Sequence, residues 1–171
     1  SERNIGLAAL RQVFMRTLLN GSIAVGIEGR GLMRSTDHGM NWSQLSNETL
    51  FDRSVTSLFV KGSGELILTT TFRIFRSTDN GVNWILTGYP LDVNSSVVQA
   101  LAIHANGNMF AAAYGGVYRS TDNGGTWTRA IVGLPSPPIV QLILMLANDD
   151  ILIGTQNNGM YRSSNLGATW V

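Results

Sequence analysis

One ten-residue phrase occurs four times in this chain, and each copy ends in a tryptophan. The copies are MRSTDHGMNW at 33–42, FRSTDNGVNW at 75–84, YRSTDNGGTW at 118–127 and YRSSNLGATW at 161–170. Their serines are 42, 43 and 43 residues apart, and their tryptophans are all the tryptophans of the chain. A period of about 40–45 residues is typical of a β-propeller, in which each repeat forms a blade of four antiparallel strands.

The segments that precede each phrase have the pattern of strands. In the third repeat these segments are VQALAIHA, the turn NGN and MFAAAY. Short runs of β-branched and apolar residues that end at Gly, Asn or Asp predict strands joined by tight turns. The phrase adds a third strand that ends near its serine and a fourth that begins at its tryptophan. The sequence therefore predicts an all-β propeller with four-stranded antiparallel blades at about 12–45, 55–87, 97–130 and 139–171.

Two details of this register leave alternatives open. Residues 7–18 carry apolar side chains at helical spacing, but the repeat register predicts a strand over 12–19, with a helical turn at 7–11 as the alternative. The fourth blade has only Trp170 and Val171 of its outer strand, and residues 1–5 have about the length that is missing. We therefore treat 1–171 as one propeller segment, which closes alone, pairs with another chain or belongs to a larger ring, because closure removes exposed strand edges.

The repeated phrase resembles the Asp-box, or BNR repeat, of sialidases, xyloglucanase-type glycoside hydrolases, sortilin-like receptors and Ycf48-like assembly factors. The resemblance covers nearly the whole chain through its repeats. It implies a β-propeller whose box hairpins join the third and fourth strands at the rim, away from the ligand-binding face. It also implies a secreted, periplasmic or cell-surface location. It does not imply one activity, because this fold hosts enzymes, receptors and scaffolds.

A structural role explains the phrase without a substrate. The short carboxylate can accept hydrogen bonds from N–H groups of its own turn, the glycine can adopt a positive φ, and the tryptophan can hold the hairpin against its blade. The fourth copy has Asn165 in place of aspartate, which a repeated catalytic carboxylate would not tolerate. The residues assigned to this structural role are Ser35, Asp37, Gly39, Trp42, Ser77, Asp79, Gly81, Trp84, Ser120, Asp122, Gly124, Trp127, Ser163, Asn165, Gly167 and Trp170.

An arginine precedes each of these serines, at positions 34, 76, 119 and 162. Sialidases use an arginine cluster to bind a carboxylate, because a guanidinium can donate two parallel hydrogen bonds. Here all four arginines occupy one repeat position on the third strand, far from the propeller axis. The register therefore predicts that they pair or pack along the blade edges.

Composition narrows the classes of partner. The chain has 171 residues, of which 13% are charged, and its formal net charge is +1. It therefore lacks the excess of positive charge that is typical of proteins that bind nucleic acid. It contains no cysteine, and no apolar run approaches the ~20 residues of a membrane-spanning helix. Neither His38 nor His104 has a neighbour at metal-ligand spacing. The sequence predicts no metal, no cofactor, no nucleic-acid partner and no transmembrane segment.

The expected ligand face is formed by the loops between second and third strands and by the links between blades. The candidate binding residues on these loops are Glu28, Arg30, Arg73, Tyr114 and Asn157. The alternative is that they are ordinary solvated loop residues.

A glycosidase needs two carboxylates ~5–10 Å apart across a cleft. The acids of this face outside the boxes, Glu28, Glu48, Asp52 and Asp92, are scattered over different loops. We therefore expect a non-catalytic interaction or scaffold module for a protein or glycan partner, with ring completion by another copy as one form of assembly. The alternative is a fragment of a sialidase- or xyloglucanase-like hydrolase whose catalytic residues lie outside this chain.

Overall fold

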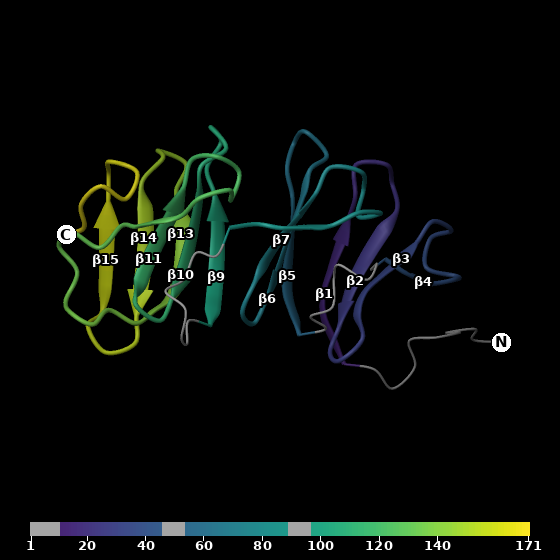
Figure 1. Cartoon of the computed structure of the whole chain (residues 1–171), viewed down its shortest axis with the longest axis horizontal. Coiled ribbons are helices and arrows are strands. Elements are labelled where there is room, and N and C mark those ends of the chain that lie inside the picture. The colour runs from purple at the N-terminus through teal and green to yellow at the C-terminus, as the bar shows by residue number, and fades with distance from the viewer. Residues whose placement is uncertain (1–10, 46–53, 89–96) are drawn as a thin grey trace. The chain divides into compact units, whose positions relative to one another are not determined.

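A computed structural model describes residues 11–45, 54–88 and 97–171. These residues form four antiparallel sheets and no helix, so the chain is all-β as the repeats predict. No helix of the described residues is long and apolar enough to cross a membrane. The chain divides into two compact units, Ser1–Leu86 and Thr87–Val171, and each contains two sheets (Figure 1).

The two sheets of the first unit have their strands in chain order. The first sheet consists of β1 (Gln12–Thr17), β2 (Ile23–Ile27), β3 (Gly31–Ser35) and β4 (Ser43–Gln44). The second consists of β5 (Val55–Val60), β6 (Leu66–Thr70), β7 (Ile74–Ser77) and β8 (Ile85–Leu86). Residues 12–17 are thus a strand, and residues 7–10 of the helical alternative lie outside the described residues.

The second unit repeats this arrangement. Its first sheet consists of β9 (Val98–Ile103), β10 (Met109–Ala113), β11 (Gly116–Ser120) and β12 (Thr128–Arg129). Its second consists of β13 (Val140–Met145), β14 (Ile151–Thr155) and β15 (Met160–Ser163). Val171 also exchanges two backbone hydrogen bonds with Arg162, at 2.8 and 3.0 Å, at the register of the fourth strand in the other sheets. The proposed completion of this strand by residues 1–5 lies outside the described residues.

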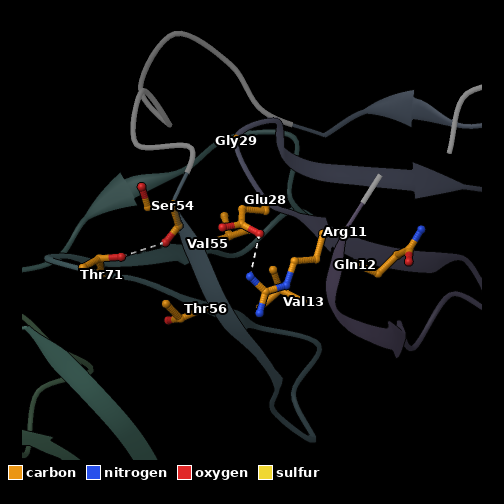
Figure 2. Close-up of a pocket in the computed structure, with 9 residues that line it drawn as sticks. All are labelled: Arg11, Gln12, Val13, Glu28, Gly29, Ser54, Val55, Thr56 and Thr71. Atoms are coloured by element: carbon orange, nitrogen blue, oxygen red, sulfur yellow. Dashed lines mark hydrogen bonds and ion pairs between the residues drawn. The ribbon is translucent and has the colours of Figure 1, made fainter. Parts of the chain in front are cut away.

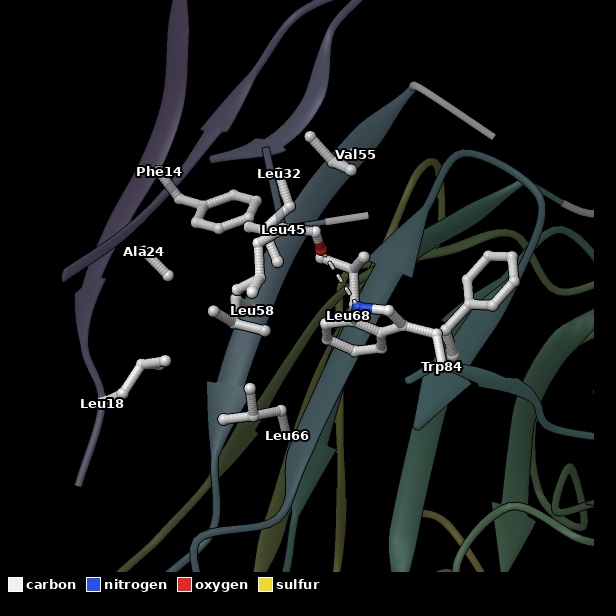
Figure 3. Packing of buried hydrophobic residues seen from close by; sticks show 11 residues of the cluster. Phe14, Leu18, Ala24, Leu32, Leu45, Val55, Leu58, Leu66, Leu68 and Trp84 are labelled. Carbon is white, nitrogen blue, oxygen red and sulfur yellow. Dashed lines mark hydrogen bonds between the residues drawn. The ribbon is translucent and has the colours of Figure 1, made fainter. Parts of the chain in front are cut away.

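The core of each unit lies between its two sheets. Successive side chains of a strand point to opposite faces of the sheet, so each sheet has two faces with different neighbours. In the first unit Phe14 and Leu32 of the first sheet pack against Leu58 and Leu68 of the second (Figure 3). Phe75 of the second sheet belongs to the same buried cluster. We call the face of a sheet that points toward the sheet following it in its unit the forward face, and the opposite face the backward face.

The same two faces meet in the second unit. Phe110 and Val117, from the forward face of its first sheet, share one buried cluster with Ile151 and Ile153 from the backward face of its second. All four side chains are at most 1% exposed. Burial of this apolar area is the main stabilising term, at roughly 25 cal/mol per Å² removed from water. The repeat therefore uses one kind of sheet contact twice, once in each unit.

Candidate functional site

Each repeated phrase forms a hairpin that is closed by its own serine and aspartate. In the first copy the Ser35 hydroxyl donates to Asp37 Oδ1 at 2.7 Å and accepts from the Gly39 N–H at 2.8 Å. Asp37 accepts from the backbone N–H of Asn41 at 2.9 Å and from its side-chain amide at 2.7 Å. The second copy repeats these bonds, and the third repeats them with the Thr126 hydroxyl in place of the side-chain amide. Because all of them lie within one hairpin, the carboxylates hold turns and face no common cavity.

The fourth hairpin keeps this geometry with an amide. Asn165 Oδ1 accepts from the Ser163 hydroxyl and from the Thr169 N–H, both at 2.9 Å. Leu166 and Gly167 have φ of 54° and 79°. A positive φ is unfavourable for leucine, so the surrounding hydrogen bonds must hold this residue in place.

The box carboxylates have lowered pKa values. Hydrogen bonds from the backbone N–H of Asn41, from its side chain and from Ser35 lower the pKa of Asp37 to about 2. Thr126, through its backbone N–H and then its hydroxyl, and Ser120 lower the pKa of Asp122 to about 2. Each carboxylate thus favours the folded state above its ordinary pKa of 3.8, and this contribution is lost as the pH falls through about 2.

We therefore expect the thermal unfolding midpoint to fall between about pH 4 and about pH 2. The double variant Asp37→Asn/Asp122→Asn should show a shallower fall, and Asn165→Asp should show a steeper one. Circular dichroism melts across this pH range measure both effects. Profiles of the three proteins that superimpose after a constant offset would contradict the assignment.

The tryptophans differ in a way that their identical sequence positions do not reveal. The indole N–H groups of Trp42 and Trp127 donate to a carbonyl of their own hairpin, at 3.0 and 3.2 Å, and both rings are half-buried. Trp84 donates instead to Leu45 O at the end of the preceding sheet, at 3.2 Å. Trp170 makes the equivalent bond at 2.8 Å, and both of these rings are only 2% exposed. Two of the four tryptophans therefore join neighbouring sheets within a unit.

The arginines of the repeats fall into two groups. Arg76 and Arg162 bind acidic side chains, whereas the Nε atoms of Arg34 and Arg119 are buried without a hydrogen-bond partner. Arg76 forms an ion pair with Glu65, and Arg162 donates through Nε to Asp150 Oδ2 at 2.8 Å. Burial acts to raise the pKa of Glu65, but hydrogen bonds from Lys61 and Arg76 outweigh it and hold this pKa below its ordinary value. These acids lie in the turns between first and second strands, so the pairs bridge strands along a blade edge and form no anion-binding cluster.

A pocket of about 550 Å³ lies in the first unit, where β1 and β5 begin (Figure 2). Its described lining consists of Arg11, Gln12, Val13, Glu28, Gly29, Ser54, Val55, Thr56 and Thr71. Arg11 Nη1 donates to Glu28 Oε2 at 3.1 Å, and both side chains are exposed, at 81% and 58%. The pocket therefore has a paired cation and anion and three hydroxyl-bearing residues around two valines. The Thr56 hydroxyl lies 2.8 Å from that of Thr69, and the Thr71 hydroxyl donates to Ser54 O at 3.4 Å.

Backbone hydrogen bonds hold the rim of this pocket. The Glu28 N–H donates to Arg11 O and the Thr71 N–H donates to Ser54 O, both at 3.0 Å. Each bond ties the loop after a second strand to the residue before the first strand of the same sheet. The two sheets thus bring equivalent loops to one rim, which is the face that the sequence predicts for a ligand.

A family model described as the BNR/Asp-box repeat matches residues 118–129. The chain carries an Asp-box repeat. No curated protein matches its sequence.

Several solved propeller structures are similar to this chain. Ycf48 bound to D1 peptide is 16% identical, with 95% of this chain and 53% of that chain covered and a TM-score of 0.68. A GH74 xyloglucanase from Xanthomonas campestris is 17% identical, with 89% and 28% covered and a TM-score of 0.73. A catalytically inactive virginiamycin B lyase from Staphylococcus aureus with quinupristin is 18% identical, with 100% and 58% covered and a TM-score of 0.74.

These similarities show the fold of this Asp-box chain, which is a β-propeller fold, and not its activity. The chain spans less than two thirds of each of these proteins. They include the peptide-bound Ycf48 as well as two proteins named as enzymes, so the fold by itself fits a binding protein and an enzyme equally.

The predicted binding residues of the Asp-box chain are dispersed over its two units. Glu28 lines the pocket, whereas Arg30 and Arg73 follow on the same kind of loop but do not line it. Tyr114, which is 39% exposed, and Asn157 lie on the equivalent loops of the second unit. These five residues therefore remain candidates, and Glu48, Asp52 and Asp92 lie outside the described residues.

Sequence reasoning missed the pocket residues Arg11, Ser54, Thr56 and Thr71. The repeat register was the signal that could have found them, because it places residues 11 and 54 just before the first strands of their sheets. Within 11–45, 54–88 and 97–171, no group of three or more His, Cys, Asp or Glu side chains is arranged to hold a metal ion.

Proposed function

We propose that this chain is a non-catalytic interaction module that binds a protein or glycan partner at the pocket of its first unit. The observation that carries the proposal is the exposed Arg11–Glu28 pair on the loop face, beside the hydroxyls of Ser54, Thr56 and Thr71. A guanidinium donates, a carboxylate accepts and a hydroxyl does both, so the pocket matches a ligand rich in hydroxyl or amide groups. The proposal includes a secreted, periplasmic or cell-surface location, which the resemblance implies.

The chemistry of the lining favours binding over hydrolysis. Of the nine described lining residues, Glu28 alone carries a carboxylate, and it is paired with Arg11. Glycoside hydrolysis requires a second carboxylate across the scissile bond. The alternative, a segment of a sialidase- or xyloglucanase-like hydrolase, therefore needs catalytic groups from outside these residues.

The test combines a glycan array and a peptide array with variants of the pocket. We expect a ligand of the wild-type chain to bind Arg11→Gln and Glu28→Gln at least about tenfold more weakly, because a hydrogen bond to a charged group contributes about 1.5–3 kcal/mol. Arg16→Gln is the matched control, since Arg16 is also exposed, lies on the strand that begins directly after Arg11 and is outside the lining. Calorimetric titration measures each affinity.

Two results would overturn the proposal. One is a wild-type chain that binds nothing on either array. The other is a ligand whose affinity the Arg11 and Glu28 substitutions leave unchanged. Cleavage of an arrayed glycan by the wild-type chain would favour the hydrolase alternative instead.

A further inference from the structure

The second sheet of the first unit shows how this repeat can hold a buried carboxylate. Lys61 Nζ, just after β5, lies 2.6 Å from Glu65 Oε2, and Arg76 on β7 donates through Nε to Glu65 Oε1. The Glu65 side chain is only 10% exposed. A buried charge is costly unless it is paired, and here two cations flank one anion.

The first sheet of the second unit carries three polar residues at the same positions. In both sheets the N–H of the residue after the first strand donates to the carbonyl of the residue before the second strand, at 2.8 Å. The second and third strands also pair in the same register. We call His104, Asn108 and Arg119 the polar triad, and they hold the positions of Lys61, Glu65 and Arg76, respectively. A neutral amide therefore replaces the carboxylate between the two basic side chains.

Two nitrogen atoms of the polar triad are buried without a hydrogen-bond partner among the described residues. They are His104 Nε2 and Arg119 Nε. His104 Nδ1 accepts from the Asn106 N–H at 3.1 Å, so the proton of the neutral ring belongs on Nε2, which is then a donor. His104 and Asn108 are 8% and 9% exposed. Because a buried N–H without an acceptor loses its hydration and gains nothing, both donors require an acceptor at this place.

The acidic side chain beside the polar triad does not take the place of Glu65. Asp149 Oδ1 lies 3.1 Å from His104 Nε2, but at an angle that makes no hydrogen bond, and the Asp149 side chain is 68% exposed. Arg119 takes part in none of the ion pairs of the described residues. Its guanidinium carbon lies 6.0 Å from the ring centroid of Phe110, which leaves the hydrogen-bonding capacity of Nε unused.

The other sheets differ from this one at the same positions. In the last sheet Asp150 holds the central position and accepts from Arg162 Nε at 2.8 Å. In the first sheet the Nε atom of Arg34 is also buried without a partner, but Leu18 holds the position of His104. Among the described residues, two unbonded donors therefore flank the central position in the polar triad alone.

We propose that the polar triad binds the carboxylate group of a ligand. His104 Nε2, the Asn108 amide and Arg119 Nε donate to this group, and the Glu65 site of the first unit is the template. The two oxygens of a carboxylate accept several hydrogen bonds, and its planar shape matches a guanidinium. The carboxylate belongs either to a small organic acid or to an acidic side chain of a bound peptide. This site lies in the second unit and shares no residue with the pocket of the first.

Nuclear magnetic resonance titration of the whole chain with acetate and with a capped glutamate peptide tests the proposal. We expect the Nε–H signal of Arg119 to shift saturably with a carboxylate and not with chloride at the same ionic strength. A response to the peptide alone identifies an acidic side chain as the ligand, and a response to acetate identifies a small organic acid. Asn108→Asp should weaken binding at least about tenfold, because its own carboxylate then accepts from Arg119. Asp149→Asn should strengthen binding about twofold, because it removes a nearby like charge.

Arg129→Gln is the control for a change of charge elsewhere in the same sheet. Arg129 is exposed on β12 and donates to Gly115 O, so this variant should bind the carboxylate as the wild type does. Circular dichroism spectra that match the wild type show that the variants are folded. A wild-type chain that responds to neither carboxylate, an Asn108→Asp variant that binds as tightly as the wild type, or an Arg129→Gln variant that binds as weakly as Asn108→Asp would overturn the proposal.

Discussion

Trp84→Ala is expected to lower the free energy of unfolding of the first unit by about 3–5 kcal/mol. The ring is 2% exposed within the core between the two sheets, and its N–H donates to Leu45 O. Removal of the ring leaves a cavity and also an unpaired carbonyl in the contact between the sheets. Urea unfolding followed by far-ultraviolet circular dichroism measures the loss without relying on tryptophan fluorescence.

Trp42→Ala is the matched control at the same repeat position. Trp42 is half-buried and bonds only to its own hairpin, so its loss should be less than half as large. Where Trp84→Ala fails to fold, Trp84→Phe keeps most of the apolar contact and should cost about 1 kcal/mol for the lost hydrogen bond. Equal losses at Trp84 and Trp42 would contradict the joining role of Trp84.

Gly133→Ala is expected to destabilise the second unit by about 3 kcal/mol or more. Gly133 has a φ of 96°, and a Cβ built there would lie 2.1 Å from the backbone oxygen of Trp170. The backbone there is held in place, since the Trp170 N–H donates to Val132 O at 2.8 Å. Movement of the segment before the last sheet or of the fourth hairpin would therefore disrupt this hydrogen bond. Chemical unfolding at equilibrium measures the cost.

Gly107→Ala separates the two causes of this cost. Gly107 has nearly the same φ, 93°, but a Cβ built there would meet nothing within 4 Å. This control should lose only the roughly 1 kcal/mol that a positive φ costs an alanine. The difference between the two variants measures the close approach of the backbones. No difference would contradict the close packing of the link against the fourth hairpin.

The local parts of the fold followed from the sequence because their interactions are local. The hydrogen bonds of Ser35, Asp37 and Gly39 join residues at most four positions apart, and four copies of the phrase made the turn recognisable. The positions of the strands could be predicted for the same reason, from the apolar segments and from the 42- to 43-residue spacing of the phrases. Of the pocket, only Glu28 was predicted, because it lies on a polar loop, whereas Ser54 and Thr71 have no local signature of a site.

The amino-acid sequence by itself determined that this chain makes box hairpins and four-stranded antiparallel sheets, since both rest on contacts between neighbouring segments. Only the tertiary structure decided which face of each sheet is covered. A strand with apolar residues on both faces has the same pattern whether one neighbour or two lie against it, as the leucines of β13 show. The different partners of Trp42 and Trp84 have the same origin, because a preceding sheet, and not the phrase around the tryptophan, supplies the carbonyl that the indole contacts.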